Sequence, residues 1–346
     1  MMCPVGILSG KRVSSMTNKD VPGSSPLLQV ENLKKHYHVE SIWSKQQIVK
    51  AVDGISFSVM AGTTLGIVGE SGCGKSTAGR AILNLDRPTM GKVIFEGEDI
   101  VNTSQKEWRD LRRKMQLVFQ DPFAALNGRK HVKDLLAEPF KIHHIANGKE
   151  LTNLVMELLD MVGLPHDSIS KYPHEFSGGQ RQRLVIARAI ALRPKLVVCD
   201  EPVSALDVSV QSQIVNLFKR LQVELKLTYL FISHDLSIVR HMSDEVGVMY
   251  LGKMSELAST EEIFQHPLHP YTKALLSAAP IPDPLIQRHR ERIILNGDLP
   301  SPIAPPAGCR FHTRCPFAES KCMQEEPMWR EASPNHWVAC HLAGAE

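Results

Sequence analysis

The chain has 346 residues, of which 43% are hydrophobic, so it is long enough for about two domains with packed cores. Its 40 basic and 37 acidic residues give a net charge of +3, which argues against a dedicated nucleic-acid-binding protein. No apolar run approaches the roughly eighteen residues of a membrane span, and the N-terminus lacks a charged start followed by an apolar segment, so we expect a cytosolic protein.

The first segment, residues 1–26, is rich in serine, glycine, proline and other polar residues and has no periodicity. Such a composition buries too little apolar surface to fold. We therefore expect a disordered leader, within which Met16 offers an alternative start of translation.

Four short apolar runs follow, and segments with helical patterns separate them. Runs rich in β-branched residues and apolar on both faces are typical of a parallel sheet covered by helices. The sequence therefore predicts an α/β core with strands in TLGIVG (ending at Gly69), KLVVCD (195–200), YLFISHD (229–235) and VGVMYLG (246–252).

A helical insertion of roughly sixty residues is predicted between the first two of these runs, because the pattern of apolar residues changes there from strand-like runs to helical spacing. The segment LTNLVMELLDMVGL has apolar residues at helical spacing, and a glycine, Gly163, closes it. The apolar stripe consists of Leu151, Leu154, Val155, Leu158, Leu159 and Val162.

The C-terminal part of the chain changes character again. From about Ala279 onward prolines multiply, as in APIPDP and LPSPIAPPAGC. This pattern indicates a linker followed by a small irregular, cysteine-rich module, together spanning residues 279–346.

The segment GESGCGKST, from Gly69 to Thr77, fits the phosphate-binding pattern G-x-x-x-x-G-K-[ST] and lies between a predicted strand and a predicted helix. The glycines let backbone N–H groups turn toward phosphate, Lys75 is expected to reach the β- and γ-phosphates, and the Ser76 hydroxyl is expected to ligate Mg²⁺. A chance glycine-rich turn is the alternative, which the flanking strand and helix disfavour. The predicted nucleotide contacts in this loop are Gly69, Ser71, Gly72, Cys73, Gly74, Lys75, Ser76 and Thr77.

A second acidic element, LVVCDEP, delivers Asp200 and Glu201 to the carboxyl end of a predicted strand, where open α/β sheets hold their ligands. We expect Asp200 to hold Mg²⁺ through water, and Glu201 to orient or deprotonate the attacking water. The alternative is that the two acids only cap the following helix.

Between these two elements, EFSGGQRQRLVIARAIAL places a Ser-Gly-Gly turn at the start of an amphipathic helix. Free N–H groups and the helix dipole make such a turn a binding site for anions. Since the phosphate-binding loop already serves one nucleotide, this turn is expected to bind another phosphate.

In this order, these motifs are similar to those of the ATP-binding cassette ATPases, whose signature is FSGGQ. Further motifs fall at the family's positions. LVFQDP resembles the Q-loop with Gln120, SALD the D-loop with Asp207, and ISHD the switch-histidine motif with His234, while Tyr37 stands where the family places an aromatic residue that stacks on adenine. Taken singly, each of these residues has an ordinary structural explanation, and the shared order of the motifs outweighs it.

The resemblance implies the fold of a P-loop ABC ATPase over residues 27–278. That fold has a RecA-like parallel sheet core, an antiparallel β subdomain and a helical subdomain, which here is expected at about residues 121–182. It also implies that two such domains pair head to tail and enclose ATP, so that hydrolysis separates them.

The roles of single residues follow from the same resemblance. Catalytic roles fall to Glu201, His234 and Gln120, and Mg²⁺ ligation falls to Ser76, Gln120 and Asp200. Nucleotide contacts outside the phosphate-binding loop are Tyr37, Asp200, Asp207 and, on the opposite site of the dimer, Ser177, Gly178, Gly179 and Gln180.

The segments HPLHPYTKALLSAAP and GDLPSPIAPPAGCRFHTRCPFAESKC resemble the C-terminal extension of dipeptide and oligopeptide permease ATPases, the second ATPase subunit in particular. This implies the ATP-hydrolysing subunit of a peptide importer at the cytoplasmic face of the inner (plasma) membrane. The expected partners are a paired ATPase subunit, two permease subunits and, through them, an extracytoplasmic substrate-binding protein. A soluble cassette ATPase without a transport role, or an importer of nickel, opines or sugars, remains the alternative.

The remaining pattern is C-x5-C-x6-C-x17-C over Cys309, Cys315, Cys322 and Cys340. These gaps are wider than the paired cysteines of common zinc sites, and four thiolates on a flexible loop suit a [4Fe–4S] cluster. The family resemblance favours the cluster, for which we expect a structural role because the module has little apolar core. Plain thiols, or zinc with help from the nearby histidines, stay open; those histidines are His312, His336 and His341.

Overall fold

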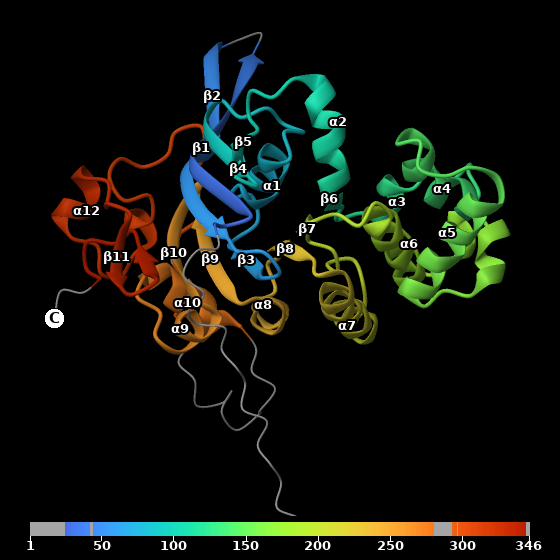
Figure 1. The fold of residues 1–346 in the computed structure, drawn as a ribbon. Coiled ribbons are helices and arrows are strands. Elements are labelled where there is room, and N and C mark those ends of the chain that lie inside the picture. The colour runs from blue at the N-terminus through green and yellow to red at the C-terminus, as the bar shows by residue number, and fades with distance from the viewer. Residues whose placement is uncertain (1–24, 42–43, 280–292, 296, 344–346) are drawn as a thin grey trace, which may run out of the picture.

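The computed structural model describes residues 25–41, 44–279, 293–295 and 297–343. The predicted disordered leader therefore lies almost wholly outside the described residues, and so does much of the predicted proline-rich linker. Within the described residues the chain forms two sheets, helices that cover them, and a further group of helices beside them (Figure 1).

The larger sheet contains the predicted core strands. Its parallel part has the order β9-β3-β8-β7-β6. All four predicted apolar runs are strands of this array, so the predicted parallel α/β core is confirmed. The strands are β3 (Thr64–Val68), β6 (Met115–Val118), β7 (Leu196–Asp200), β8 (Thr228–Ile232) and β9 (Glu245–Tyr250).

The central strands are apolar on both faces because each face packs against a different core. Side chains alternate between the faces of a strand, so β7 and β8 contribute to both cores. One core includes helix α1 (Lys75–Ile82) and the smaller sheet, and it takes Leu196, Val198, Leu230 and Ile232. The other core includes the helices of the opposite face, and it takes Val197, Cys199, Tyr229 and Phe231.

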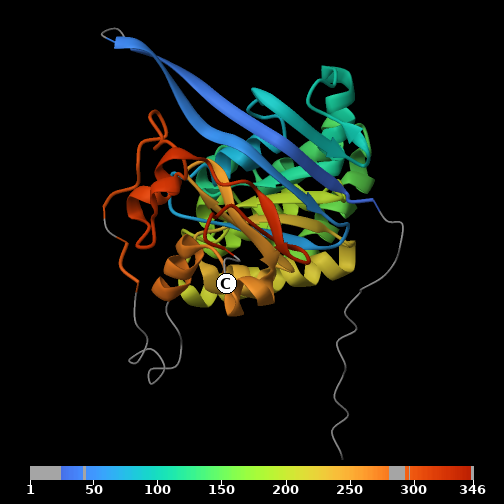
Figure 2. The ribbon, with the colours of Figure 1, turned by 90° about the vertical axis from the view of Figure 1, so that its left-hand side faces the viewer.

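The smaller sheet is antiparallel, with the order β2-β1-β4-β5. Figure 2 shows its long β1–β2 hairpin crossing above the larger sheet. It matches the antiparallel part of the fold that the family resemblance implies. Its strands are β1 (Leu28–Ser41), β2 (Ser44–Val59), β4 (Met90–Phe95) and β5 (Glu98–Asp99).

The opposite face of the larger sheet is covered by helices from the second half of the chain (Figure 2). No helix in the described part of the chain is long and apolar enough to cross a membrane. These helices are α7 (Val208–Leu225), α8 (Leu236–Met242), α9 (Thr260–Gln265) and α10 (Pro270–Ala278).

A group of helices lies beside the core, as Figure 1 shows in green. Helix α5 (Gly148–Val162) confirms the predicted apolar stripe, of which only Leu154 is half-buried, and Gly163 ends it in the left-handed conformation (φ 67°). The group also contains α3 (Pro122–Ala125), α4 (Val132–Ile142), η1 (His166–Ser170), η2 (Pro173–Glu175) and α6 (Gly178–Ile190), and α2 (Gln105–Lys114) lies between it and the smaller sheet.

The predicted small, irregular, cysteine-rich C-terminal module is not supported. The C-terminal strand β12 (His336–Val338) pairs with β10 (Lys253–Ser259) and β11 (Arg330–Ser333) pairs with β12, so the module extends the larger sheet. An edge strand exposes unpaired N–H and C=O groups, and the chain's own C-terminal strands satisfy those of β10. Short helices, η3 (His312–Arg314) and α12 (Ser320–Gln324), complete this part.

A buried carboxylate fastens the C-terminal strands to the core. Glu256 of β10 is fully buried, and its two oxygens accept hydrogen bonds from the amides of Leu268 (2.7 Å) and His269 (2.9 Å). The same carboxylate lies 2.7 Å from Nε2 of His336, which belongs to β12. One acidic side chain thus joins β10, the start of α10 and the C-terminal strand.

Replacing Glu256 with alanine is expected to destabilise the fold by on the order of 3 kcal/mol, because buried donors lose their acceptor. Urea unfolding of the full chain measures this loss. Glu261→Ala, on the exposed side of α9, is the control and is expected to change the free energy of unfolding by less than about 0.5 kcal/mol. Equal effects of the two substitutions would contradict the assigned role of Glu256.

Candidate functional site

The phosphate-binding loop connects β3 to α1, as the motif predicts. Its backbone requires glycine at Gly74, where φ is 105° and a Cβ would lie 2.1 Å from the carbonyl oxygen of Ala51. The Lys75 side chain is buried, and its ammonium group donates to the carbonyl oxygens of Gly69 (2.8 Å) and Glu70 (3.0 Å). The loop backbone thus holds the Lys75 ammonium group within the loop, an arrangement that suits a bound phosphate.

Two of the three predicted magnesium ligands, Ser76 and Asp200, meet beside this loop, whereas Gln120 contacts Glu201. The Ser76 hydroxyl donates to the Asp200 carboxylate over 2.6 Å, across two elements that are far apart in the sequence. Burial raises the pKa of Asp200, although the hydrogen bond from Ser76 lowers it in part. A buried carboxylate next to a hydroxyl offers the hard oxygen ligands that Mg²⁺ prefers, so these residues fit the predicted ion.

Glu201 lies at the centre of the predicted catalytic group. Its carboxylate accepts a hydrogen bond from Nε2 of Gln120 (3.0 Å) and lies 3.2 Å from Nδ1 of His234. The Glu201 backbone is in the left-handed region (φ 45°), which is strained for a residue with a side chain and is often found at functional sites. Side chains from three separate motifs therefore converge on one carboxylate.

A pocket of about 240 Å³ contains most of these groups. Val49 and Ala51 of β2 form one wall, and Pro302, which the motifs do not predict, belongs to the lining as well. The Pro302 carbonyl accepts a hydrogen bond from the Lys50 amide (3.1 Å), so the C-terminal part of the chain borders the pocket. The remaining lining residues are Ser71, Gly72, Gly74, Lys75, Ser76, Thr77, Gln120 and Glu201.

Tyr37, the predicted adenine-stacking residue, lies next to this pocket. It is the cross-strand neighbour of Val49, its hydroxyl donates to Asp86 (3.0 Å), and Lys35 lies over its ring, 4.7 Å from the ring centre. Burial and the Asp86 carboxylate raise the pKa of Tyr37. Within the described chain Tyr37 contacts the hairpin and is not part of the pocket lining.

The structure places the signature turn apart from the pocket. Ser177 caps α6 together with Gln180, and Gly179 packs so closely on Val210 that a Cβ would lie 2.4 Å from its Cγ1. Among the described lining residues of the pocket, none belongs to this turn. Gly178, at the first position of α6, shares this location with the rest of the turn. One copy of the chain therefore does not bring its own signature turn to its own phosphate-binding loop.

Asp207 caps the helix that follows the acidic pair. Its carboxylate accepts hydrogen bonds from the Val210 amide (3.0 Å) and the Ser209 hydroxyl (2.7 Å) at the start of α7. Asp200 and Glu201 instead face Ser76, Gln120 and His234. The alternative in which this acidic pair only caps the helix is therefore wrong.

Cys73 contributes to the loop through its backbone. Its side chain is buried in the core, where burial raises the pKa of the thiol, and its carbonyl oxygen accepts a hydrogen bond from the Gly252 amide (2.8 Å). The predicted nucleotide contact at Cys73 is therefore restricted to main-chain atoms.

The four C-terminal cysteines gather in one region. The Cys309 amide donates to the Cys322 carbonyl (2.8 Å), and Cys322 and Cys340 are buried. The pKa of Cys309 is raised to about 11, mainly by burial and to a smaller extent by the thiols of Cys322, Cys340 and Cys315. Burial also raises the pKa values of Cys315 and Cys340. All four are free thiols.

The described side chains do not support a metal at these cysteines. In the part of the chain that the structure describes, no group of three or more histidine, cysteine or acidic side chains is arranged to hold a metal ion. Metal binding requires thiolates, whereas burial favours the protonated form of Cys309, Cys315 and Cys340. The described side chains therefore support neither the predicted [4Fe–4S] cluster nor the zinc alternative. The spacing and number of cysteines, on which both predictions rested, do not determine where the sulfur atoms point.

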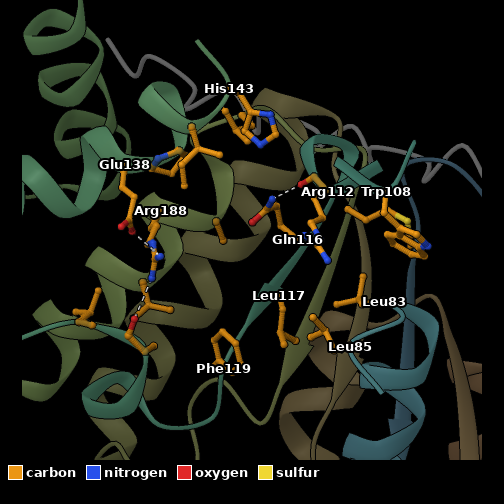
Figure 3. A pocket seen from close by; sticks show the side chains of 18 residues that line it. Leu83, Leu85, Trp108, Arg112, Gln116, Leu117, Phe119, Glu138, His143 and Arg188 are labelled. Carbon is orange, nitrogen blue, oxygen red and sulfur yellow. Dashed lines mark hydrogen bonds and ion pairs between the residues drawn. The ribbon is translucent and has the colours of Figure 1, made fainter. Parts of the chain in front are cut away.

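A second hollow, a groove of about 380 Å³, lies between the core and the group of helices (Figure 3). Its lining is largely apolar and includes the exposed side chains of Leu85, Phe119 and Ile142. Glu138 and Arg188, which form an ion pair (2.8 Å), also line it. Phe119 in this groove directly precedes Gln120 in the pocket, so one short segment joins the two hollows.

Family models match two parts of the chain. A model described as "ABC transporter" matches residues 52–204, and a model described as "Oligopeptide/dipeptide transporter, C-terminal region" matches residues 255–322.

Similar curated proteins extend over nearly the whole chain. The chain is 54% identical to the oligopeptide transport ATP-binding protein AppF of Bacillus subtilis, over 91% of this chain and 97% of that protein. It is 49% identical to the oligopeptide transport ATP-binding protein OppF of Salmonella typhimurium, over 91% of this chain and 95% of that protein.

Solved structures share the fold. The ATP-binding cassette MJ0796, in a dimeric post-hydrolysis state with ADP and phosphate, matches with a TM-score of 0.61 and 27% identity, over 67% of this chain and 98% of that one. CbiO1 from Clostridium perfringens, part of the ABC transporter complex cbiONQ, matches with a TM-score of 0.60 and 29% identity, over 70% and 92% of the two chains.

Gly74→Ala is expected to weaken nucleotide binding by at least about tenfold, because it forces a clash with the Ala51 carbonyl and a strained backbone. Binding of a fluorescent ATP analogue to the purified chain measures the effect. Gly62→Ala is the matched control, since Gly62 also has a positive φ (78°) but its Cβ would meet nothing within 4 Å. Unchanged binding by the Gly74→Ala variant would contradict the assigned loop geometry.

Proposed function

The chain belongs to the ABC transporter family, among the ATP-binding subunits of oligopeptide and dipeptide transporters, and we propose that it is the ATP-hydrolysing subunit of an oligopeptide importer. The observation that carries the proposal is the convergence of Gln120 and His234 on Glu201, next to the Ser76–Asp200 pair. A phosphate-binding lysine, candidate magnesium ligands and a candidate general base thus lie around one pocket, as phosphoryl transfer to water requires.

In the proposed reaction, Lys75 and the backbone N–H groups of the loop bind the β- and γ-phosphates. Ser76 and Asp200 would hold Mg²⁺, which when bound would supply neutralisation of charge on the phosphate oxygens. Glu201 accepts a proton from the attacking water, whose oxygen bonds to the γ-phosphorus as the bond to the β-phosphate oxygen breaks. The products are ADP and phosphate.

Gln120 and His234 are proposed to act around Glu201. His234 is more than half exposed and lies beside Glu201, so it can contact both the water and the γ-phosphate. Gln120 donates a hydrogen bond to the same carboxylate, and the residue before it, Phe119, lines the apolar groove. Movement of the segment that carries these two residues would therefore change the geometry around Glu201.

A paired ATPase subunit is proposed to complete the site. The signature turn at Ser177–Gln180 opens helix α6, whose N-terminal end favours an anion, yet the turn lies outside the chain's own pocket. Head-to-tail pairing would bring it to the phosphate-binding loop of the partner. The dimeric form of the similar cassette MJ0796 supports this arrangement.

The apolar groove is proposed to bind a permease subunit, which would keep the chain at the cytoplasmic face of the membrane. Its exposed apolar side chains suit a short amphipathic segment, because their burial on binding is favourable. The link from Phe119 to Gln120 then connects permease movement to ATP hydrolysis. A soluble role without transport would leave this groove without a partner.

The cargo is proposed to be oligopeptides, on the strength of the relatives and of the matching C-terminal region. An extracytoplasmic binding protein would deliver them to the permeases. Nickel, opines or sugars remain the alternative cargoes, since the described pocket and groove contain nothing that selects a transported molecule.

Glu201→Gln is expected to lower ATP turnover of the assembled complex by at least about a hundredfold, because the general base is lost. The variant should still bind ATP, since the ligands of the phosphates are unchanged. Phosphate release and nucleotide binding are measured on the same preparation, and near wild-type turnover would refute the assignment.

The groove is tested by Ile142→Asp, which places a charge on a half-exposed groove side chain. Copurification with the permease subunits in detergent is expected to fall by at least about tenfold, as for a central interface residue. Val223→Asp on α7, at a position that is 80% exposed and outside the groove lining, is the control. Equal recovery of permeases with both variants would exclude the groove as the docking site.

A further inference from the structure

A turn of the C-terminal region reaches the phosphate-binding loop from outside the cassette motifs. This turn spans Cys309–Cys315 and is anchored by Phe311. The Phe311 ring packs against Tyr271 of α10, with ring centres 5.4 Å apart, and against Tyr250 of β9, at 5.2 Å. All three rings are buried, so the turn is fixed to the main core.

Glu70, the second residue of the phosphate-binding loop, is held through its amide, its carbonyl and its carboxylate. Its amide donates to the Tyr271 hydroxyl (2.9 Å), and its carbonyl accepts from Lys75 (3.0 Å). Its carboxylate accepts a hydrogen bond from Nη1 of Arg314, at 2.8 Å. Arg314 belongs to the C-terminal turn, so this turn holds the loop through an ion pair.

The ion pair is largely shielded from water, because the Arg314 side chain is 9% exposed and that of Glu70 is 28% exposed. Among the residues that the structure describes, Arg314 is the cation paired with Glu70. An unpaired carboxylate in this loop would repel the phosphates of a nucleotide, and poor screening by water strengthens that repulsion. Arg314 offsets this charge while Lys75 remains directed at the loop.

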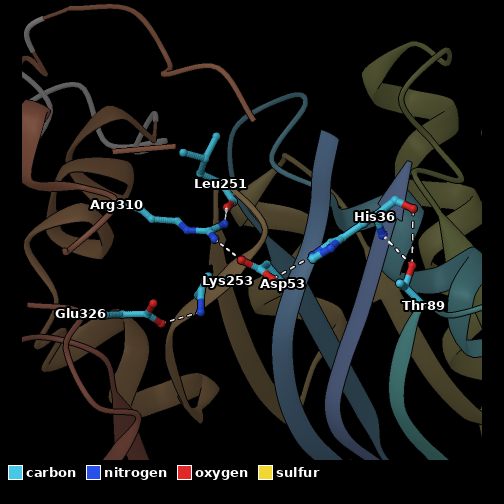
Figure 4. Close-up of polar contacts among 7 residues, drawn as sticks. All are labelled: His36, Asp53, Thr89, Leu251, Lys253, Arg310 and Glu326. Carbon is cyan, nitrogen blue, oxygen red and sulfur yellow. Dashed lines mark hydrogen bonds and ion pairs between the residues drawn. The ribbon is translucent and has the colours of Figure 1, made fainter. Parts of the chain in front are cut away.

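A second arginine of the same turn provides a comparison (Figure 4). Arg310 pairs with Asp53 of β2 and donates to the Leu251 carbonyl, and Asp53 also bonds His36 (2.8 Å). The exposed fractions of the Arg310 and Asp53 side chains are 10% and 11%. The two arginines thus anchor one turn with similar burial, but Arg310 binds groups outside the phosphate-binding loop.

We propose that Arg314 is a positioning residue for ATP binding: it neutralises Glu70 and fixes the phosphate-binding loop, so that the C-terminal region forms part of the nucleotide site. Pro302, which lines the pocket and bonds the Lys50 amide, is a second point at which this region meets the site. The inference rests on the proposed function only in taking ATP as the ligand.

The alternative is that Arg314 merely fastens the C-terminal region to the core, as Arg310 does. The two roles differ in what Glu70 does when Arg314 is lost. If charge is the cause, removing the carboxylate as well restores nucleotide binding. If fastening is the cause, loss of either arginine has the same effect, and a change at Glu70 rescues neither.

The experiment compares R314Q, R310Q and E70Q/R314Q as full-length chains, by titration with a fluorescent ATP analogue, and as assembled complexes, by ATP turnover. R314Q is expected to raise the Kd and the KM for ATP by at least about fivefold and to leave kcat within about twofold. R310Q is expected to bind ATP within about twofold of the wild type, E70Q/R314Q to recover most of the affinity that R314Q loses, and R314K to lie between R314Q and the wild type.

Equal binding by R314Q and R310Q, or no recovery in E70Q/R314Q, would overturn the inference. R314Q could also unfold at a lower temperature than R310Q. In that case ATP binding by E70Q/R314Q distinguishes the two roles, because this variant lacks the ion pair but carries no unpaired charge. Failure of the proposed function would look different: the wild type would not bind ATP, or E201Q would turn over ATP at the wild-type rate.

Discussion

Burial of the central parallel strands on both faces is the constraint on which the site depends. Every residue of β3, β7 and β8 is buried, so charged side chains are excluded from the middle of these strands and gather where the strands end. Parallel strands end at a common edge, which is why Lys75, Asp200, Glu201 and His234 meet although long stretches of chain separate them. The packing of the two cores thus determines that the charged residues of the site gather at the carboxyl ends of the parallel strands.

The C-terminal region covers the edge of the same sheet at strand β10. Strand β12 covers β10, and the buried Glu256 fastens it there. From that position the preceding turn reaches the phosphate-binding loop through Arg314, and Pro302 reaches the pocket. A segment that protects a sheet edge is thereby placed next to the candidate nucleotide site, and burial within it raises the pKa values of Cys309, Cys315 and Cys340.

The proposed transport cycle follows from what one copy of the chain lacks. The signature turn and the phosphate-binding loop lie apart within the chain, so a partner is needed to join them. The segment carrying Phe119 and Gln120 borders the apolar groove on one side and Glu201 on the other. A permease bound in the groove and a partner ATPase at the pocket would therefore act on the same carboxylate from two directions.

The sequence alone determined the parallel core, the phosphate-binding loop, the acidic pair and the stripe of α5, because each depends on periodicity or on residues close together in the chain. The contacts of Gln120 and His234 with Glu201 agree with motif order, which reflects the shared edge of the sheet. Only the tertiary structure decided that β11 and β12 extend the sheet, that Arg314 pairs with Glu70, and how the four thiols are buried. These features join residues that are distant in sequence, through strand pairing or through single side chains. No local pattern in the sequence determines which partner a strand edge, a cation or a thiol will contact.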